Sequence, residues 1–556
     1  MTKVVSLVKA VSATVNPGAT VLFAFTHNRS HAAAFELARQ FKDRPCLTLV
    51  ATGLLEYASI LCAAGAIARV ESAFAGSTYP GPAPSRQLQL EIDRTSDNDP
   101  HWTNLTVTLR LMAGAMGWPF VPTQSLAGSD LWAGKARATV EDPFTGQPMS
   151  VLAPLRPDVA FLHVPVADTL GNAIVHGPDA EASWGVWAAR HVVVTAERIV
   201  SPEELRRMGP RSGIPGHIVD FVVKAPFGAH PQGQFVWSAE EEVASYAEDY
   251  EFRSELRRLT RDPARLRQWV EEWVFATDHA GYLERLGAER LTRLRREAIA
   301  PTPAPALPAD LVSAEERAAT LAMRIAVEEA ASGRHDLFFA GIGLAHLAAW
   351  AAEQICRGRG VAADLVAETG MYGFHPIEGD PYLFNRPNAA SSLFHMSFVR
   401  TLGAIAGPHG TRCLAMIAAA QIDPSGNVNS SRSANGQFIV GSGGANDLAA
   451  GASRCLVVMP LKPGRFVEHL PFVTTPARAL MGVATDLAWL QPDPSGTLEI
   501  AGLMCPPGGE EATLAEIKAR TGAELPLARD LRRFDPPEDD ELQRLRRFDP
   551  QRLLLA

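Results

Sequence analysis

The chain has 556 residues, which is too long for one hydrophobic core, so two or more domains are expected. Its net charge of −9 and pI near 6.0 argue against a nucleic-acid partner, which favours a basic face. No apolar run reaches membrane-spanning length, and the N-terminus lacks a signal-peptide layout. The six cysteines form no CxxC pair and indicate free thiols in a reducing compartment. We therefore expect a cytoplasmic protein without a disulfide frame, a zinc site or membrane contact.

The first part of the chain alternates between strand-like and helical patterns. A strand-like run at 20–25 is followed by the polar turn THNRS (26–30) and a helical stretch at 31–41, whose N-terminus offers N–H groups to an anion. Further strands are expected at 46–53, 160–167 and 191–196, and charged helices with a solvated face at 240–299. His27 and His31 lie four residues apart, but no third ligand is near, which favours a loop and helix-start role over a metal pair.

A proline-rich stretch divides the chain just past its middle. Residues 300–310 read APTPAPALPAD, with four prolines in eleven residues, and cannot form a helix or a central strand. We therefore expect an N-terminal domain at 1–299 with a helical segment at its end, a linker at 300–310 and a second domain at 311–505. The charged segment 506–556 is expected to be a peripheral extension without chemistry.

The second half repeats landmarks of the first half in the same order. DLVAETG (364–370) echoes LTLVATG (47–53), and the residue that the first copy lacks is Glu368. DPSGN (423–427) echoes DTLGN (168–172), and RCLVV (454–458) echoes RHVVV (190–194). The order of these matches predicts two homologous open α/β domains in tandem, with the active site in the cleft between them.

Glu368 follows a short apolar run and precedes Thr369-Gly370, so it is expected at the carboxyl end of a buried strand, where ligands bind in open α/β sheets. An isolated acid there is more often structural, but its presence in one copy only favours function. A glycine cluster, GSGGAND (441–447), follows a second apolar run, and its amides can stabilise an oxyanion. Asp447 alternatively caps the next helix, and Gly341 and Gly343 form a further glycine loop.

Taken together, these motifs resemble family I coenzyme A transferases, nearest to the glutaconate branch, with α-like and β-like halves fused in one chain. The β-like motifs are ETGMYG (368–373), DPSGN (423–427) and GSGGAND (441–447). The α-like motifs are FTH (25–27), RLMAGA (110–115), PTQS (122–125), DTLGN (168–172), IPGHIVD (214–220) and APFGAHP (225–231). Two departures stand out: FAF (23–25) replaces a Gly-Gly-Phe loop, and Thr369 replaces Ser or Asn.

The resemblance implies a ping-pong transfer of CoA from an acyl-CoA to a carboxylic acid, among them dicarboxylic and 3-oxo acids, through a glutamyl-CoA thioester on Glu368. It implies coenzyme A as a co-substrate, no permanently bound cofactor or metal, acyl-CoA and carboxylic acids as partners, and a homo-oligomer. Catalysis is assigned to Glu368, Gly443 and Gly444. Substrate or CoA contacts are assigned to Thr26, His27, Gly341, Gly343, Thr369, Gly370, Gly441, Ala445, Asn446 and Asp447.

Two other classes of function stay open at this stage. On the same fold, the chain would be an acyl-CoA hydrolase, a ring-opening hydrolase or a decarboxylase; in a different class, it would be a non-catalytic acyl-CoA-binding protein. Four side chains are candidates to face a substrate carboxylate, although each is more simply explained as a surface or structural residue: His27, Arg29, Arg86 and Gln124.

Overall fold

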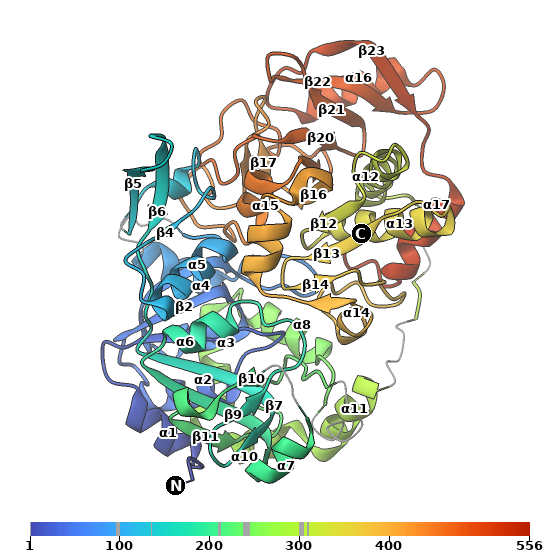
Figure 1. Cartoon of the computed structure of the whole chain (residues 1–556). Helices are drawn as coiled ribbons and strands as arrows, with labels where there is room; N and C mark the ends of the chain where they lie inside the picture. The colour runs from blue at the N-terminus through green and yellow to red at the C-terminus, as the bar shows by residue number, and fades with distance from the viewer. Residues whose placement is uncertain are drawn as a thin grey trace.

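The computed structural model shows two α/β domains, one above the other in Figure 1, with the first half of the chain below and the second half above. It describes residues 2–95, 101–134, 136–209, 213–236, 245–299, 305–307 and 311–556. Most of the expected linker, 300–304 and 308–310, therefore lies outside the described residues. No described helix is both long enough and apolar enough to cross a membrane.

The first domain is built on a sheet of eight strands whose six central strands run parallel. Helices from residues 7–95 and 250–286 cover one face, and helices at 104–116 and 182–188 cover the other, so the sheet is buried on both sides. The order of the central strands is β3 (Ile67–Ala75), β2 (Leu47–Leu54), β1 (Thr20–Phe23), β7 (Val159–Asp168), β9 (His191–Val200) and β11 (Phe221–Lys224). The short strand β8 (Ala173–Ile174) pairs with the end of β7, and β10 (Gly213–Ile214) pairs with β8.

The helices of this domain include a group that the charged region 240–299 contributes. The sequence predicted a solvated face there, and the structure adds a buried face: Phe252, Leu256 and Trp269 pack into the core of the first domain. The helices are α1 (Leu7–Thr14), α2 (His31–Gln40), α3 (Glu56–Ala63), α4 (Arg86–Thr95), α5 (Asn104–Met116), α6 (Ala182–Ala188), α7 (Pro202–Arg207), α8 (Tyr250–Leu259), α9 (Pro263–Val270), α10 (His279–Leu286) and α11 (Ala288–Ile299). A small sheet joins β4 (Val121–Pro122), β6 (Pro148–Leu152) and β5 (Arg137–Glu141).

The second domain repeats the parallel arrangement and extends it at both edges. Its parallel strands are β13 (Asp364–Ala367), β12 (Leu337–Ala340), β16 (Cys413–Ala418), β19 (Arg454–Val458) and β20 (Leu480–Ala484). The edges are β14 (Met371–Tyr372) with β15 (Phe394–His395), and β21 (Ala488–Pro492), β22 (Leu498–Met504) and β23 (Leu527–Phe534). One face carries α12 (Ala314–Ala331), α13 (Leu344–Gly358) and α17 (Asp539–Phe548); the other carries α15 (Ala445–Gly451), η5 (Val399–Ile405) and α16 (Glu510–Arg520).

The two sheets have the same strand order, and two of the strand pairings share one register. In the first domain Leu22 of β1 lies opposite Val50 of β2, and in the second domain Phe339 of β12 lies opposite Val366 of β13. Val50 and Val366 are the matching valines of LTLVATG and DLVAETG. The tandem of two homologous open α/β domains is therefore confirmed.

The second sequence echo is also the same structural unit in both domains. The Asn172 side chain donates to Asp168 Oδ2 at 2.6 Å, and the Asn427 side chain donates to Asp423 Oδ2 at 3.0 Å. In both turns the glycine before the asparagine has a positive φ, +96° in the first domain and +78° in the second. The asparagine and the glycine thus recur because the same tight turn requires them.

Candidate active site

Glu368 occupies a turn that the second domain has and the first domain lacks. β2 continues beyond Ala51 to Leu54, but β13 ends at Ala367, and the extra residue starts a turn closed by the Gly370 N–H donating to Ala367 O at 3.0 Å. Gly370 has φ +122°, and a Cβ there would clash with the carbonyl oxygen of Met396. The inserted acid therefore directly follows the last residue of the strand, at the carboxyl end of β13.

Two cavities meet at Glu368 in the cleft between the domains. A larger one, of about 530 Å³, and a smaller one, of about 60 Å³, share four lining residues: Phe74, Ile342, Glu368 and Gly443. The smaller cavity is lined by both copies of the repeated strand end: Thr52 and Gly53 of the first domain, and Glu368 and Thr369 of the second. The carboxylate thus faces a wide space on one side and a narrow one on the other.

Most of the residues assigned from the sequence line one of these cavities. The larger cavity is lined by Gly341, Gly343, Gly441, Gly443, Gly444 and Ala445, and the smaller cavity by His27, Thr369 and Gly443. Four assigned residues, all described by the structure, line neither cavity: Thr26, Gly370, Asn446 and Asp447.

Burial and a neighbouring acid set the charge of Glu368. Its pKa is raised to about 7, first because the carboxylate is desolvated and second because Asp447 lies near it. The Asn104 side chain and the Gly444 amide donate to the carboxylate and oppose this rise in pKa. Asn104 begins α5 in the first domain and was not predicted from the sequence as part of the site.

The glycine segment 441–447 docks directly on the first domain. The Gly443 N–H donates to Ala73 O at 3.0 Å, and Gly443 O accepts from the Asn104 N–H at 3.0 Å. The Gly443 N–H, which was expected to hold an oxyanion, thus already has a backbone partner in the first domain. Gly444 lies against the acid instead, and a Cβ there would overlap Glu368 Oε2.

Asn446 and Asp447 hold the domains together. Asn446 Oδ1 accepts from the Leu126 N–H at 2.8 Å, and Asp447 Oδ2 accepts from the Leu105 N–H at 3.0 Å. Asp447 thus bonds to the first turn of α5 across the cleft, where the sequence suggested a cap on its own helix. Burial raises the pKa of Asp447 to about 7.

His27 forms part of the wall of the smaller cavity in its neutral state. Its ring stacks on Phe235 with 4.0 Å between centroids, and Nε2 accepts from the Phe235 N–H at 3.0 Å. Burial lowers its pKa well below the ordinary value. His31 instead contacts the Arg29 carbonyl oxygen, and no group of three or more potential metal ligands gathers within the described part of the chain.

The C-terminal extension returns to the cleft. Leu553 and Leu554 line the larger cavity, and Asp549 holds them by accepting from the Leu553 N–H at 2.9 Å and the Leu554 N–H at 2.7 Å. Earlier in the extension, β23 adds a strand to the second sheet, and α17 packs on α12 and α13. The extension is thus part of the second domain and of the cavity wall, which its charged composition did not indicate.

The site lies between the domains, where a wide and a narrow cavity meet at the partly buried Glu368 carboxylate. A backbone amide and an asparagine hold this carboxylate. The two cavities together suit an extended ligand. Residues 4–225 match the family model described as Coenzyme A transferase. The resemblance found in the sequence is therefore confirmed over these residues of the first domain.

The chain is also similar to individual proteins along its length. An uncharacterized protein of Archaeoglobus fulgidus is 32% identical over 53% of this chain and 64% of its own length. One subunit of the glutaconate CoA-transferase of Acidaminococcus fermentans is 28% identical over 53% of this chain and 95% of its own. A solved acyl-CoA transferase of Escherichia coli covers 96% of this chain and 95% of its own with a TM-score of 0.68 at 15% identity, so the whole chain shares its fold.

Proposed function

We propose that the chain is a CoA-transferase that moves CoA from an acyl-CoA to a carboxylic acid through a glutamyl-CoA thioester on Glu368. One observation carries the proposal: the carboxylate lies where the two cavities meet. The larger cavity would take the CoA arm, with Arg257 and Arg465 in its wall available to the phosphates, and the smaller one the acyl group.

In the first half-reaction, a Glu368 carboxylate oxygen attacks the thioester carbonyl carbon. The C–S bond breaks, the CoA thiolate leaves, and an acyl-glutamyl anhydride forms. The thiolate then attacks the Glu368 carbonyl carbon, the anhydride C–O bond breaks, and the first acid leaves as its carboxylate. The product is a glutamyl-CoA thioester, which a second carboxylate converts to a new acyl-CoA by the same steps in reverse.

The hydrogen bonds of Glu368 suit the second of these steps. When the thiolate attacks the Glu368 carbonyl, negative charge develops on an oxygen of Glu368 itself. The Gly444 N–H and the Asn104 side chain already donate to that carboxylate. Donors that are in place before the reaction stabilise an oxyanion without reorganising. These contacts support Gly444 and Asn104 as the oxyanion donors of the proposed reaction, where the sequence suggested Gly443 and Gly444.

The test is the intact mass of the protein after incubation with a series of acyl-CoAs, with and without an acceptor acid. We expect an adduct of CoA less water on the peptide that contains Glu368, which the acceptor removes as new acyl-CoA appears. Glu368→Gln should give no adduct. Steady release of free CoA without an acceptor would contradict transfer and indicate a hydrolase. Unchanged acyl-CoA binding with no adduct on any residue would indicate a non-catalytic binder.

A further inference from the structure

One strongly basic side chain lines the smaller cavity together with Glu368. Arg29 lies in the loop between β1 and α2, is only 2% exposed, and comes from the opposite domain to the acid. Of the four side chains that the sequence offered as carboxylate contacts, Arg29 and His27 line this cavity. Arg86 and Gln124 are exposed and line neither cavity.

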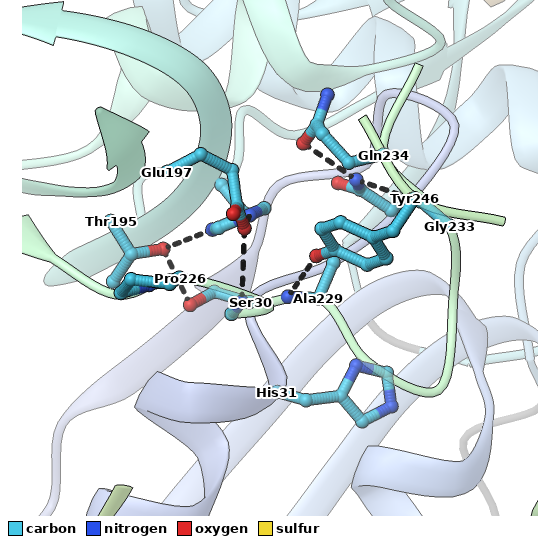
Figure 2. Close-up of polar contacts among 12 residues, drawn as sticks. Ser30, His31, Thr195, Glu197, Pro226, Ala229, Gly233, Gln234 and Tyr246 are labelled. Carbon is cyan, nitrogen blue, oxygen red and sulfur yellow. Dashed lines mark hydrogen bonds and ion pairs between the residues drawn. The ribbon is translucent and has the colours of Figure 1, made fainter. Parts of the chain in front are cut away.

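The loop that carries Arg29 is fixed on both sides. Asn28 donates to Gly233 O at 2.9 Å, and Ser30 bonds to Thr195 at 2.8 Å. Figure 2 shows Ser30 and Thr195 in contact beside Glu197, and the Gly233–Gln234 segment on the other side of the loop. The Arg29 N–H itself donates to Gln232 Oε1 at 2.9 Å. The backbone therefore positions this side chain before any ligand arrives.

Within the described residues, the Arg29 guanidinium lacks the partners that a buried cation needs. Its Nε and Nη1 are buried and have no hydrogen-bond partner there, and no carboxylate lies within ion-pair distance. The guanidinium carbon lies 4.0 Å from the ring centroid of Phe25. Glu181 is close enough for Arg29 to lower its pKa, but burial outweighs this effect and raises the pKa to about 7. A buried charge without a bonded partner is unfavourable, so an anionic ligand is the natural complement.

The cavity itself limits the size of that ligand. At about 10–15 Å³ for each water-sized group, about 60 Å³ holds roughly four to six heavy atoms. A succinyl or glutaryl group has five or six heavy atoms beyond its reacting carbonyl. Several aromatic and aliphatic side chains in the wall suit the methylene groups between the two ends: Phe25, Leu55, Ile342, Phe384 and Phe398.

We propose that Arg29 determines acyl specificity by binding the distal carboxylate of a short dicarboxylic acyl group while Glu368 attacks the thioester at its other end. The inference rests on the proposed function. Arginine suits this task because its planar guanidinium stays charged and pairs geometrically with carboxylates. Gly53 belongs to the same arrangement, since a Cβ there would lie 3.1 Å from Arg29 Nη2.

The experiment compares glutaryl-CoA with pentanoyl-CoA, which have the same chain length but differ in the distal carboxylate. We measure kcat/KM with acetate as acceptor, together with CoA-adduct formation on Glu368. The unmodified protein should prefer glutaryl-CoA, and Arg29→Gln should lower the ratio of the two kcat/KM values by about 10- to 100-fold, the value of a hydrogen bond to a charged group. Arg86→Gln, an exposed arginine, is the matched control and should leave the ratio unchanged.

If Arg29→Gln lowers kcat/KM equally for both acyl-CoAs, Arg29 supports the fold and not acyl specificity, and the inference is overturned. If Arg29→Gln does not fold, Gly53→Ala, which crowds Arg29 Nη2 only mildly, should lower the same ratio, and an unchanged ratio refutes the inference. The inference is also refuted if the unmodified protein shows no preference for glutaryl-CoA over pentanoyl-CoA. If both acyl-CoAs form the adduct equally, this inference alone is refuted. If no acyl-CoA forms an adduct, the proposed function is refuted together with this inference.

Discussion

The rate of glutamyl-CoA formation should depend on pH in a way that reports the burial of Glu368. An ordinary glutamate, with a pKa near 4.5, is ionised throughout the neutral range, but the pKa of Glu368 is raised to about 7. Only the ionised form is a nucleophile, so activity is lost as pH falls through 7. The ionised fraction rises from about a tenth at pH 6 to about nine tenths at pH 8, which predicts a roughly tenfold increase in rate.

The neighbouring acid allows this explanation to be tested directly. Asp447 raises the pKa of Glu368 by charge repulsion, so Asp447→Asn should move the midpoint of the profile to lower pH. Asparagine keeps an acceptor for the Leu105 N–H, so the contact between the domains can remain. Asp486→Asn is the matched control, because Asp486 is also a buried acid that accepts a backbone N–H but is not among the groups that shift the pKa of Glu368.

The assay is a single-turnover reaction with an excess of acyl-CoA, quenched with acid and followed by intact mass between pH 5 and pH 9. A midpoint near that of an ordinary glutamate would refute the argument from desolvation. An unshifted midpoint in Asp447→Asn would refute the proposed coupling between the two acids. A shift of equal size in Asp486→Asn would show that the effect is not local to the cleft.

Three further predictions follow from contacts of Glu368. Glu368→Gln should stabilise the fold at pH 8 more than at pH 5, by at most about 3 kcal/mol in urea unfolding, because a carboxyl with a raised pKa costs stability as pH rises from 4.5 through 7. Gly444→Ala should slow adduct formation by about 100-fold without unfolding the chain, because the new Cβ displaces Glu368 Oε2. Gly358→Ala is the matched control, because no atom lies within 4 Å of its new Cβ. Asn104→Ala should slow the same step and move its pH midpoint upward, since the Asn104 hydrogen bond lowers the pKa of Glu368; a downward shift would contradict the assigned contact.

The repeat was readable from the sequence because equivalent turns and buried strands need the same residues. Matching Asp423 with Asp168 placed two turns whose hydrogen bonds the structure shows to be alike. The third sequence match, RCLVV (454–458) with RHVVV (190–194), is shifted by one residue in the structure. In the second domain Leu414 of β16 pairs with Arg454. In the first domain the equivalent residue of β7, Val159, pairs with His191 and not with Arg190. A hydrophobic strand without a turn residue gives fewer fixed points for aligning the two copies, so the alignment can slip by a residue.

The parts of the site that escaped prediction from the sequence depend on contacts between segments more than 250 residues apart. Nothing local to Asn104 shows that it will meet Glu368, and nothing local to Gly443 shows that Ala73 will accept its N–H. The role of Leu553 and Leu554 in the cavity wall has the same origin, because a charged tail carries no signal of where it folds back. Periodicity predicts which residues are buried but not which domain buries them.

The duplicated strand end explains how one ancestral unit serves two purposes in a single cleft. In the first domain β2 continues through Thr52 and Gly53, and the missing side chain of Gly53 leaves room for Arg29. In the second domain the insertion of Glu368 stops the strand and places an acid at the same cavity. On the proposed function, one copy supplies the group that holds the substrate and the other supplies the nucleophile.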